Sequence, residues 1–135
     1  MDLVIRKYCD SDYDVVNQIV YDNFSCNVSD RDVPPNIERY VCCSEEKVVG
    51  FFILTKIRNI VGGYDYYHVD YVCSAIHGQG IGSFMTEFIC NKADNDKVKY
   101  VQLTSSAKRE AARHVYQKYG FEKYDTDLFR RISKW

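Results

Sequence analysis

Apolar residues are grouped along the chain in short runs that polar or glycine-rich stretches separate. Runs rich in β-branched and aromatic residues predict strands, over residues 3–9, 38–44, 47–56, 66–73, 98–104, 121–124 and 128–132. Apolar residues at helical spacing predict helices, over residues 13–24, 84–93 and 107–119. Residues 25–36 are polar and include both prolines, which predicts a loop or a short additional helix.

The hairpin predicted across Glu45 and Glu46 indicates which strands lie near the centre of the sheet. Its second arm, from Val48 to Leu54, is apolar on both faces. A strand of that kind is buried from both sides, so we expect it near the middle of the sheet.

The composition predicts one globular domain covering residues 1–135. Of the 135 residues, 46% are hydrophobic and 15% aromatic, which is enough for a substantial core. No run approaches the length of a membrane span, and the first residues lack the order of a signal peptide. We therefore expect a protein without a membrane partner, in the cytosol by default, with the nucleus as the alternative.

Six cysteines and three histidines raise the question of a metal site or disulfides. None of the cysteines forms a Cys-x-x-Cys pair, and the histidines have no zinc-binding spacing, so no metal site is expected. Four cysteines lie in apolar surroundings and are expected to be buried, reduced thiols: Cys9, Cys42, Cys73 and Cys90.

Charge is unevenly distributed, although the net charge is only −1. Residues 1–40 hold eight acidic and four basic side chains, whereas residues 97–135 hold ten basic and four acidic ones. The acidic part favours a cationic partner and the basic part a polyanion, but ordinary solvated faces give the same distribution. The basic residues match no nucleic-acid-binding module, so no nucleic-acid partner is expected.

A glycine-rich stretch, His77–Ser83, lies between a predicted strand and a predicted helix. Its three glycines at alternate positions allow a tight turn and the close approach of a ligand. Free N–H groups in the first helical turn, together with the helix dipole, suit a phosphate or pyrophosphate. The spacing gives neither a dinucleotide fingerprint, where Ser83 would be glycine, nor a Walker loop. A plain turn without a ligand is the alternative.

The stretch resembles the pyrophosphate loop of the GNAT acetyltransferase family, Gln/Arg-x-x-Gly-x-Gly/Ala, with His77 at the usual Arg or Gln position. A second stretch is similar to the family's Ala-x-x-x-Tyr-x-x-x-Gly-Phe pattern. The matching residues are Ala112, Tyr116, Gly120 and Phe121. Arg109 stands where many members have Asn and one branch has Arg.

The resemblance covers essentially the whole chain and implies the acyl-CoA N-acyltransferase fold. This is an α+β fold, layered α/β/α, with a mixed, mostly antiparallel sheet whose fourth and fifth strands splay apart. It also implies acetyl-CoA as cosubstrate, with the pantetheine arm between those strands. The coenzyme-binding residues it implies are Val72, His77, Gly78, Gln79, Gly80, Ile81, Gly82 and Ser83.

The resemblance further implies where the reacting groups lie. A backbone N–H around Asp70 to Val72 is expected to bond the thioester carbonyl and hold the developing oxyanion. Tyr116 is expected to be the general acid that protonates the departing thiolate; the alternative is a tyrosine that only packs beneath the sheet.

The general base is sought on the strand that borders the expected cleft. Strand alternation predicts one face with His68, Asp70 and Val72, and an opposite face with Tyr67, Val69, Tyr71 and Cys73. His68 and Asp70 are therefore candidate bases, and an imidazole titrates near neutral pH. A hydrogen-bonded sheet histidine and the absence of a dedicated base are alternatives. A covalent role for Cys73 is not expected, because it is predicted on the opposite face from His68.

The expected function is acetyl-CoA-dependent N-acetylation of a primary amine, on a small molecule or a protein, by direct attack in a ternary complex. Acidic residues in and after the first helix lean toward a cationic acceptor: Asp22, Asp30, Asp32 and Glu38. The alternative is a catalytically silent acyl-CoA-binding regulatory module. Homodimers are frequent in the family, so a homodimer is a further expectation.

Overall fold

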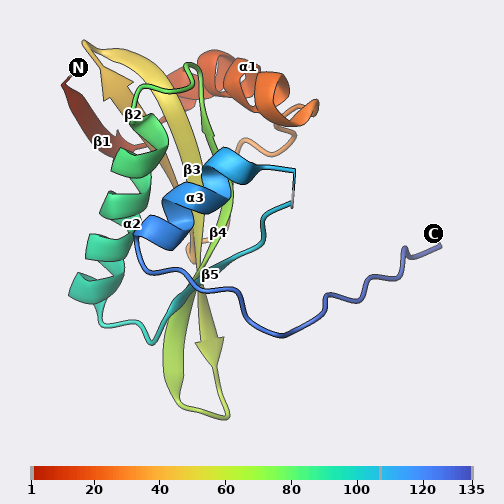
Figure 1. The fold of residues 1–135 in the computed structure, drawn as a ribbon. Helices are drawn as coiled ribbons and strands as arrows, with labels where there is room; N and C mark the ends of the chain where they lie inside the picture. Colours follow the sequence, from red (N-terminus) through yellow and green to blue (C-terminus); the bar gives the residue numbers. More distant parts are fainter. Residues whose placement is uncertain (1, 107, 135) are drawn as a thin grey trace.

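The computed structural model describes residues 2–106 and 108–134. The elements in chain order are β1 (Leu3–Lys7), the 3-10 turn η1 (Asp10–Asp12), α1 (Tyr13–Phe24), β2 (Ile37–Ser44), β3 (Lys47–Asn59), β4 (Tyr64–Ser74), α2 (Ile81–Asp96), β5 (Val101–Leu103) and α3 (Glu110–Lys118), as Figure 1 shows. Residues 25–36 form a loop, so of the two alternatives for that segment the loop is correct.

The sheet is mixed and mostly antiparallel, as predicted. Its strand order is β1-β2-β3-β4-β5. The pairs β1–β2, β2–β3 and β3–β4 are antiparallel, and the pair β4–β5 is parallel. The hairpin between β2 and β3 turns at Glu45 and Glu46, whose φ angles of 51° and 68° are both left-handed. Two left-handed central residues are the geometry that matches the twist of paired strands.

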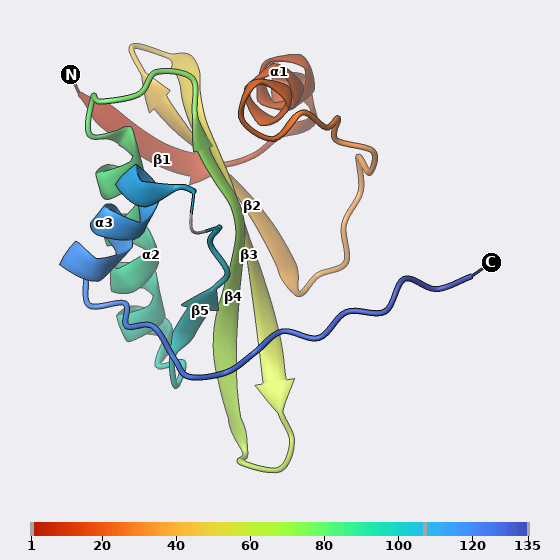
Figure 2. The same cartoon turned by 45° about the vertical axis from the view of Figure 1, so that its right-hand side comes forward.

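Helices cover both faces of the sheet, which gives the predicted layered arrangement (Figure 2). Helix α1 lies on one face, and α2 lies on the other, where α3 packs against it. The core under α1 contains Val16, Ile19, Val20, Val41, Cys43, Phe51 and Cys73. The core under α2 is formed mainly by Tyr40, Phe52, Leu54, Tyr67, Val69, Ile81, Met85 and Ile89.

The two strands predicted over residues 121–124 and 128–132 are wrong. The segment Phe121–Lys134 has no regular structure and extends away from the sheet (Figure 1). Apolar alternation favours a strand only when a neighbouring strand supplies hydrogen bonds, and this segment has none in the described chain. β5 is also shorter than predicted, and α3 begins at Glu110; position 107, included in the predicted helix, lies outside the described residues.

All six cysteines are free thiols. Cys42, Cys43 and Cys73 are buried and Cys90 is half-buried, but Cys9 is exposed, so its predicted burial is wrong. Cys9 follows the end of β1, where the chain turns outward into η1. Among the described residues, no helix has the length and hydropathy needed to span a membrane.

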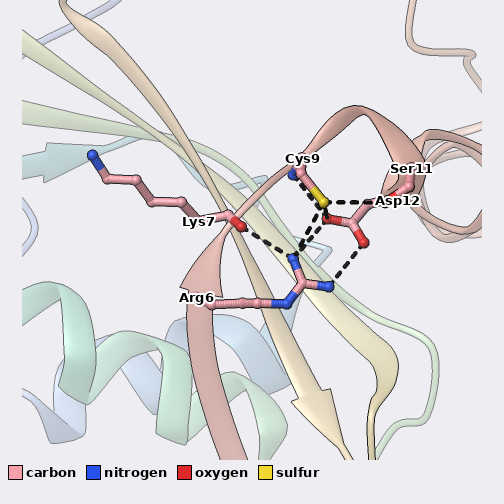
Figure 3. Close-up of polar contacts among 5 residues, drawn as sticks. All are labelled: Arg6, Lys7, Cys9, Ser11 and Asp12. Atoms are coloured by element: carbon pink, nitrogen blue, oxygen red, sulfur yellow. Dashed lines mark hydrogen bonds and ion pairs between the residues drawn. The ribbon is translucent and has the colours of Figure 1, made fainter.

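A buried carboxylate joins the end of β1 to the start of α1 (Figure 3). Asp12 accepts hydrogen bonds from Arg6 Nη1 at 2.8 Å, Arg6 Nη2 at 2.9 Å and the backbone N–H of Cys9 at 2.9 Å. The Arg6 guanidinium, against the opposing effect of burial, holds the pKa of Asp12 at about 2. The junction is therefore fixed by a charged group that is 7% exposed.

We expect Asp12→Asn to destabilise the fold by about 2 kcal/mol at pH 7. Because the folded pKa of Asp12 lies below its unfolded value, this stabilisation is present above pH 4 and is lost as the pH falls toward 2. Urea unfolding of both proteins between pH 7 and pH 2 measures the effect. Asp10→Asn is the control, since its ion pair with Arg31 is exposed on both sides and should contribute less than about 1 kcal/mol. A difference between wild type and Asp12→Asn that does not change with pH would contradict the assignment.

Candidate active site

Strand β4 contains a β-bulge in the middle of its predicted coenzyme-binding part. Cys73 is paired with Phe51 and Asp70 with Ile53, so Tyr71 and Val72 both lie opposite the single residue between them on β3. Tyr71 has a left-handed φ of 55°. One extra residue on a strand is the defining feature of a bulge and bends the strand locally.

The bulge exchanges the two faces of β4, so the predicted alternation is wrong from Tyr71 onward. Tyr67 and Val69 face the α2 core, and Val72 packs against the same core. Cys73 instead belongs to the α1 core, and the Tyr71 ring lies 5.0 Å from Phe24 of α1. Side chains alternate between the two faces of a strand, and the extra residue shifts this alternation by one position. The sequence pattern does not reveal the shift.

β4 and β5 are paired only over a short length, so they part where the bulge begins. Tyr67–Val69 pair with Val101–Leu103, and Asp70–Ser74 have no strand beside them on that edge in the described chain. This separation is the predicted splay of the fourth and fifth strands. It leaves backbone groups of β4 free along the predicted path of a pantetheine arm.

The glycine-rich stretch ends in an uncapped helix N-terminus. Gly78 and Gly80 have left-handed φ angles of 75° and 77°, and α2 begins at Ile81. The first helical bond runs from Phe84 N to Gly80 O at 3.0 Å, and no side chain of the described residues caps the helix. The N–H groups at the start of α2 are therefore available to a ligand.

Neither the backbone conformation nor the packing at the start of α2 explains the glycine at position 82. It lies within the helix, and its φ is not left-handed, so the backbone does not require glycine. A Cβ atom added at Gly82 would meet nothing within 4 Å, so packing does not require glycine either. Glycine costs a helix up to about 1 kcal/mol relative to alanine. The open space above this glycine fits a diphosphate held by backbone amides.

The second motif forms the end of α3. Gly120, with a φ of 89°, ends the helix; its N–H donates to Gln117 O at 3.1 Å, and the N–H of Phe121 donates to Tyr116 O at 3.0 Å. These two bonds and the contact of the Phe121 and Tyr116 rings, 5.8 Å apart, make a Schellman motif. The motif thus has a structural reason of its own, and it holds Tyr116 in one place.

A cavity of about 500 Å³ lies between the end of β4, the glycine-rich stretch, the start of α2 and α3. The residues singled out from the sequence that line it are Val72, His77, Gly78, Gly80, Ile81, Gly82, Ser83 and Tyr116. The side chain of Ile81 is buried in the α2 core, so only its backbone is open to a ligand. Gln79 is exposed and does not line the cavity.

The phenol of Tyr116 and the thiol of Cys73 line the cavity, and both remain protonated at neutral pH. Burial raises the pKa of the Tyr116 phenol, and Arg109 opposes this shift. Burial likewise raises the pKa of the Cys73 thiol to about 12. Tyr116 can therefore donate a proton, whereas Cys73 holds too little thiolate to act as a nucleophile. Cys73 lies on the same face as His68, not on the opposite face as predicted.

His68 and Asp70 are brought together on β4, but outside the lining of the cavity. His68 Nε2 lies 3.2 Å from Asp70 Oδ1, and His68 Nδ1 lies 3.4 Å from Gln102 Nε2 of β5. Both side chains are partly exposed. They face the side of the sheet that carries α1, beside the place where the strands part.

The polar residues Asn23, Lys108 and Arg109 also line the cavity, and the sequence motifs assign none of them to the coenzyme site. The Arg109 guanidinium lies 4.5 Å from the centre of the Phe24 ring. The sequence shows that the last part of the chain is basic, but it does not indicate that Lys108 and Arg109 lie beside the cavity. Asn23, whose Nδ2 donates to Ser74 O at 3.0 Å, gave no signal, because the contact joins residues 51 positions apart.

Glu38 is held in ion pairs on the face of the sheet that α2 covers. It lies on the α2 face, with its carboxylate 3.4 Å from Lys7 Nζ and 3.8 Å from Lys92 Nζ. Asp22, Asp30 and Asp32 are exposed. The acidic residues of the first part of the chain thus fall on different faces of the molecule.

Solved structures share this fold. A transcriptional regulator from Bacillus halodurans C-125 superposes with a TM-score of 0.83 at 21% identity, covering 97% of this chain and 100% of that one. A ribosomal-protein-alanine N-acetyltransferase from Brucella melitensis biovar Abortus 2308 gives 0.81 at 15% identity, covering 98% and 100%. A predicted acetyltransferase from Clostridium acetobutylicum, solved with acetyl-CoA, gives 0.72 at 14% identity, covering 96% of each chain.

These identities show the fold alone, and no curated protein matches the sequence. The family model for the acetyltransferase (GNAT) family, however, matches residues 4–121, from β1 to the end of the Schellman motif. That span contains the glycine-rich stretch, the bulged β4 and Tyr116. The chain therefore belongs to the GNAT family of acetyltransferases.

Proposed function

We propose that the protein transfers the acetyl group of acetyl-CoA to a primary amine, by direct attack in a ternary complex. The observation that carries the proposal is one cavity lined both by the uncapped start of α2 and by the phenol of Tyr116. The free N–H groups at the start of α2 suit a diphosphate, and the phenol of Tyr116 would be a proton donor in the same cavity.

The coenzyme contacts follow from the lining of that cavity. N–H groups of Ile81, Gly82 and Ser83 would bind the pyrophosphate, with Lys108 and Arg109 adding positive charge. The unpaired edge of β4 beside the bulge would pair with the pantetheine arm. Acetyl-CoA supplies the acyl group as a thioester, whose carbonyl oxygen would accept a hydrogen bond from backbone around Asp70 to Val72.

Tyr116 would protonate the departing thiolate. Its raised pKa keeps the proton on the phenol until a stronger base forms nearby. The proton passes from the phenol oxygen to the coenzyme sulfur, which makes the thiolate a poor nucleophile for the reverse reaction. The Schellman motif fixes the backbone that carries this side chain.

His68 and Asp70 would take the proton that the amine loses, directly or through water. Asp70 lies next to the bulge, and its carboxylate contacts the imidazole of His68. The acceptor would therefore approach over the α1 side of the sheet, where the carboxylate favours a cationic amine. The neighbouring ribosomal-protein-alanine N-acetyltransferase is named for a protein acceptor, and small amines are the other class to test.

Replacing Tyr116 with Phe is expected to lower kcat by about 10²-fold or more, because the thiolate loses its proton donor. Release of free thiol from acetyl-CoA, measured with a panel of amines and N-terminal peptides, tests this. Tyr119→Phe on the same helix should keep wild-type kcat. Equal rates for wild type and Tyr116→Phe would remove Tyr116 from the mechanism. Coenzyme binding without turnover on any amine would indicate the silent module instead.

A Gly82→Ala variant should bind coenzyme A at least about tenfold more weakly, since the new methyl group occupies the space above the helix. The same change should leave the fold as stable as before or up to about 1 kcal/mol more stable. Titration calorimetry and thermal unfolding give the two quantities. Asn91→Ala, at an exposed position of α2, serves as the control that changes helix propensity without affecting the coenzyme. Unchanged coenzyme affinity in Gly82→Ala would contradict a diphosphate at this place.

For the base, we predict that His68→Gln lowers kcat/KM for the amine by about tenfold or more at pH 7 and moves the activity profile to higher pH. At high pH the free amine has already lost its proton, so the defect should become smaller. Coenzyme affinity should not change, because His68 lies outside the cavity. Thr55→Val, on the residue paired with His68 in β3, is the matched control. A defect of the same size at every pH would speak against a role as base.

A further inference from the structure

Helix α1 covers only part of its side of the sheet. The sheet residues in the core beneath it, Val41, Cys43, Phe51 and Cys73, lie toward one end of β2, β3 and β4. The other ends of β3 and β4 extend beyond the helices as a long hairpin (Figures 1 and 2). On the α1 side, this hairpin has no helix over it in the described chain.

A row of side chains on that side leads away from His68 and Asp70. Residues paired directly across two strands point to the same side of a sheet, as do alternate residues of one strand. Ile53 packs against the α1 core, which fixes the side on which the row lies. The row, called the β3–β4 face below, consists of Asp70 paired with Ile53, His68 with Thr55, Tyr66 with Ile57, and Tyr64 with Asn59.

The end of the β3–β4 face away from the coenzyme cavity is aromatic. The Tyr66 ring stacks on Tyr100 at 4.8 Å, and the Tyr64 ring meets Tyr100 edge-on at 5.9 Å. Asn59 Nδ2 donates to the phenol oxygen of Tyr64 at 3.0 Å, which holds that ring in place. Neither core includes Tyr64 or Tyr66 among its described residues, and Tyr100 is 40% exposed. Rigid tyrosine rings outside a core are a preferred contact for a polypeptide.

The length of the β3–β4 face suits an extended chain. Asp70 and Tyr64 lie at its two ends on one strand, which at about 3.3 Å per residue are roughly 20 Å apart. A small amine bound at Asp70 would leave most of this length uncovered. About six residues of an extended polypeptide would cover it.

Charge on the face distinguishes one class of amine from another. Asp70 is the one acidic residue of the β3–β4 face, and its side chain is 43% exposed. Its carboxylate can pair with one ammonium group, and further cations would lie over Ile57 and the tyrosines without a partner. The face therefore disfavours polyamines and aminoglycosides, which carry several cations. A polypeptide whose first residues are uncharged brings a single cation to Asp70.

The surroundings of Asp70 distinguish a chain terminus from a lysine side chain. Beyond Asp70, the Phe24 ring of α1 lies 5.0 Å from the Tyr71 ring, so α1 occupies the sheet there. A polypeptide can therefore leave the site in one direction only, toward Tyr64. A terminal amine has chain on one side, whereas a lysine has chain on two. An α-amino group, with a pKa of about 8, also loses its proton more readily than a lysine, at about 10.4.

We infer that the acceptor is the N-terminal amine of an extended polypeptide, whose next residues lie along the β3–β4 face. This inference rests on the proposed function and names its acceptor class. In the reaction, the ammonium nitrogen gains the acetyl group as the bond between the acetyl carbon and sulfur breaks. The nitrogen loses two protons, one to the coenzyme sulfur by way of Tyr116 and one to the His68–Asp70 pair and then to solvent.

Thiol release from acetyl-CoA, measured on the wild-type chain with peptides of increasing length, tests the inference. An uncharged hexapeptide amide that begins with alanine should exceed alaninamide in kcat/KM at least about thirtyfold, mainly through KM. A hexapeptide with a blocked N-terminus and one internal lysine should fall at least about tenfold below the free hexapeptide, and so should spermidine.

The outcomes separate this inference from the proposed function. Equal kcat/KM values for alaninamide and the hexapeptide would overturn the inference and leave the proposed function standing. A preference for the lysine peptide or for spermidine would do the same. Absence of thiol release with every amine would reject the proposed function, and the inference with it.

Tyr66→Ala should lower the ratio of kcat/KM for the hexapeptide to kcat/KM for alaninamide about tenfold, because the peptide loses a large aromatic contact. Both substrates are measured on one preparation, so any loss of folded protein cancels in the ratio. Tyr21→Ala, at a half-exposed tyrosine of α1 outside the face, is the matched control and should keep the wild-type ratio. A ratio that Tyr66→Ala leaves unchanged would overturn the inference.

Discussion

The bulge at Tyr71 and Val72 is the constraint on which the site depends. One extra residue brings Val72 to the α2 face and Cys73 to the α1 face, and beyond it β4 runs without a neighbour. A left-handed backbone costs a non-glycine residue about 1–2 kcal/mol. Contacts from the end of α1 offset that cost, because Phe24 packs on the Tyr71 ring and Asn23 bonds to Ser74 O. Strain of this kind persists where the surrounding structure holds it in place.

The two sequence motifs differ in what they say about a ligand. Tyr116, Gly120 and Phe121 are explained by the end of a helix, and Gly78 and Gly80 by left-handed turns. Gly82 has neither explanation, since its backbone is helical and its surroundings are open. Under the proposed function, the absence of a side chain at Gly82 leaves room for the diphosphate of the coenzyme.

Local pattern was enough to predict most of the sheet and the helices. The helical period predicted for α1 matches its buried residues Val16, Ile19 and Val20. The apolar second arm of the predicted hairpin is β3, the middle strand of the sheet. The faces of β4 beyond Asp70 were not predictable, because a bulge changes register without changing composition. The ion pairs of Glu38 were not predictable either, because its partners Lys7 and Lys92 are distant in sequence.

Helix α3, which carries Tyr116, contains no fully buried residue, and it rests against α2 across the cavity. A coenzyme bound there would touch both helices and so act as the missing packing layer between them. Under the proposed function, the wall that holds the acid is then most rigid while the thioester is present. Departure of the thiol product would remove these added contacts and leave the wall less restrained until the next coenzyme binds.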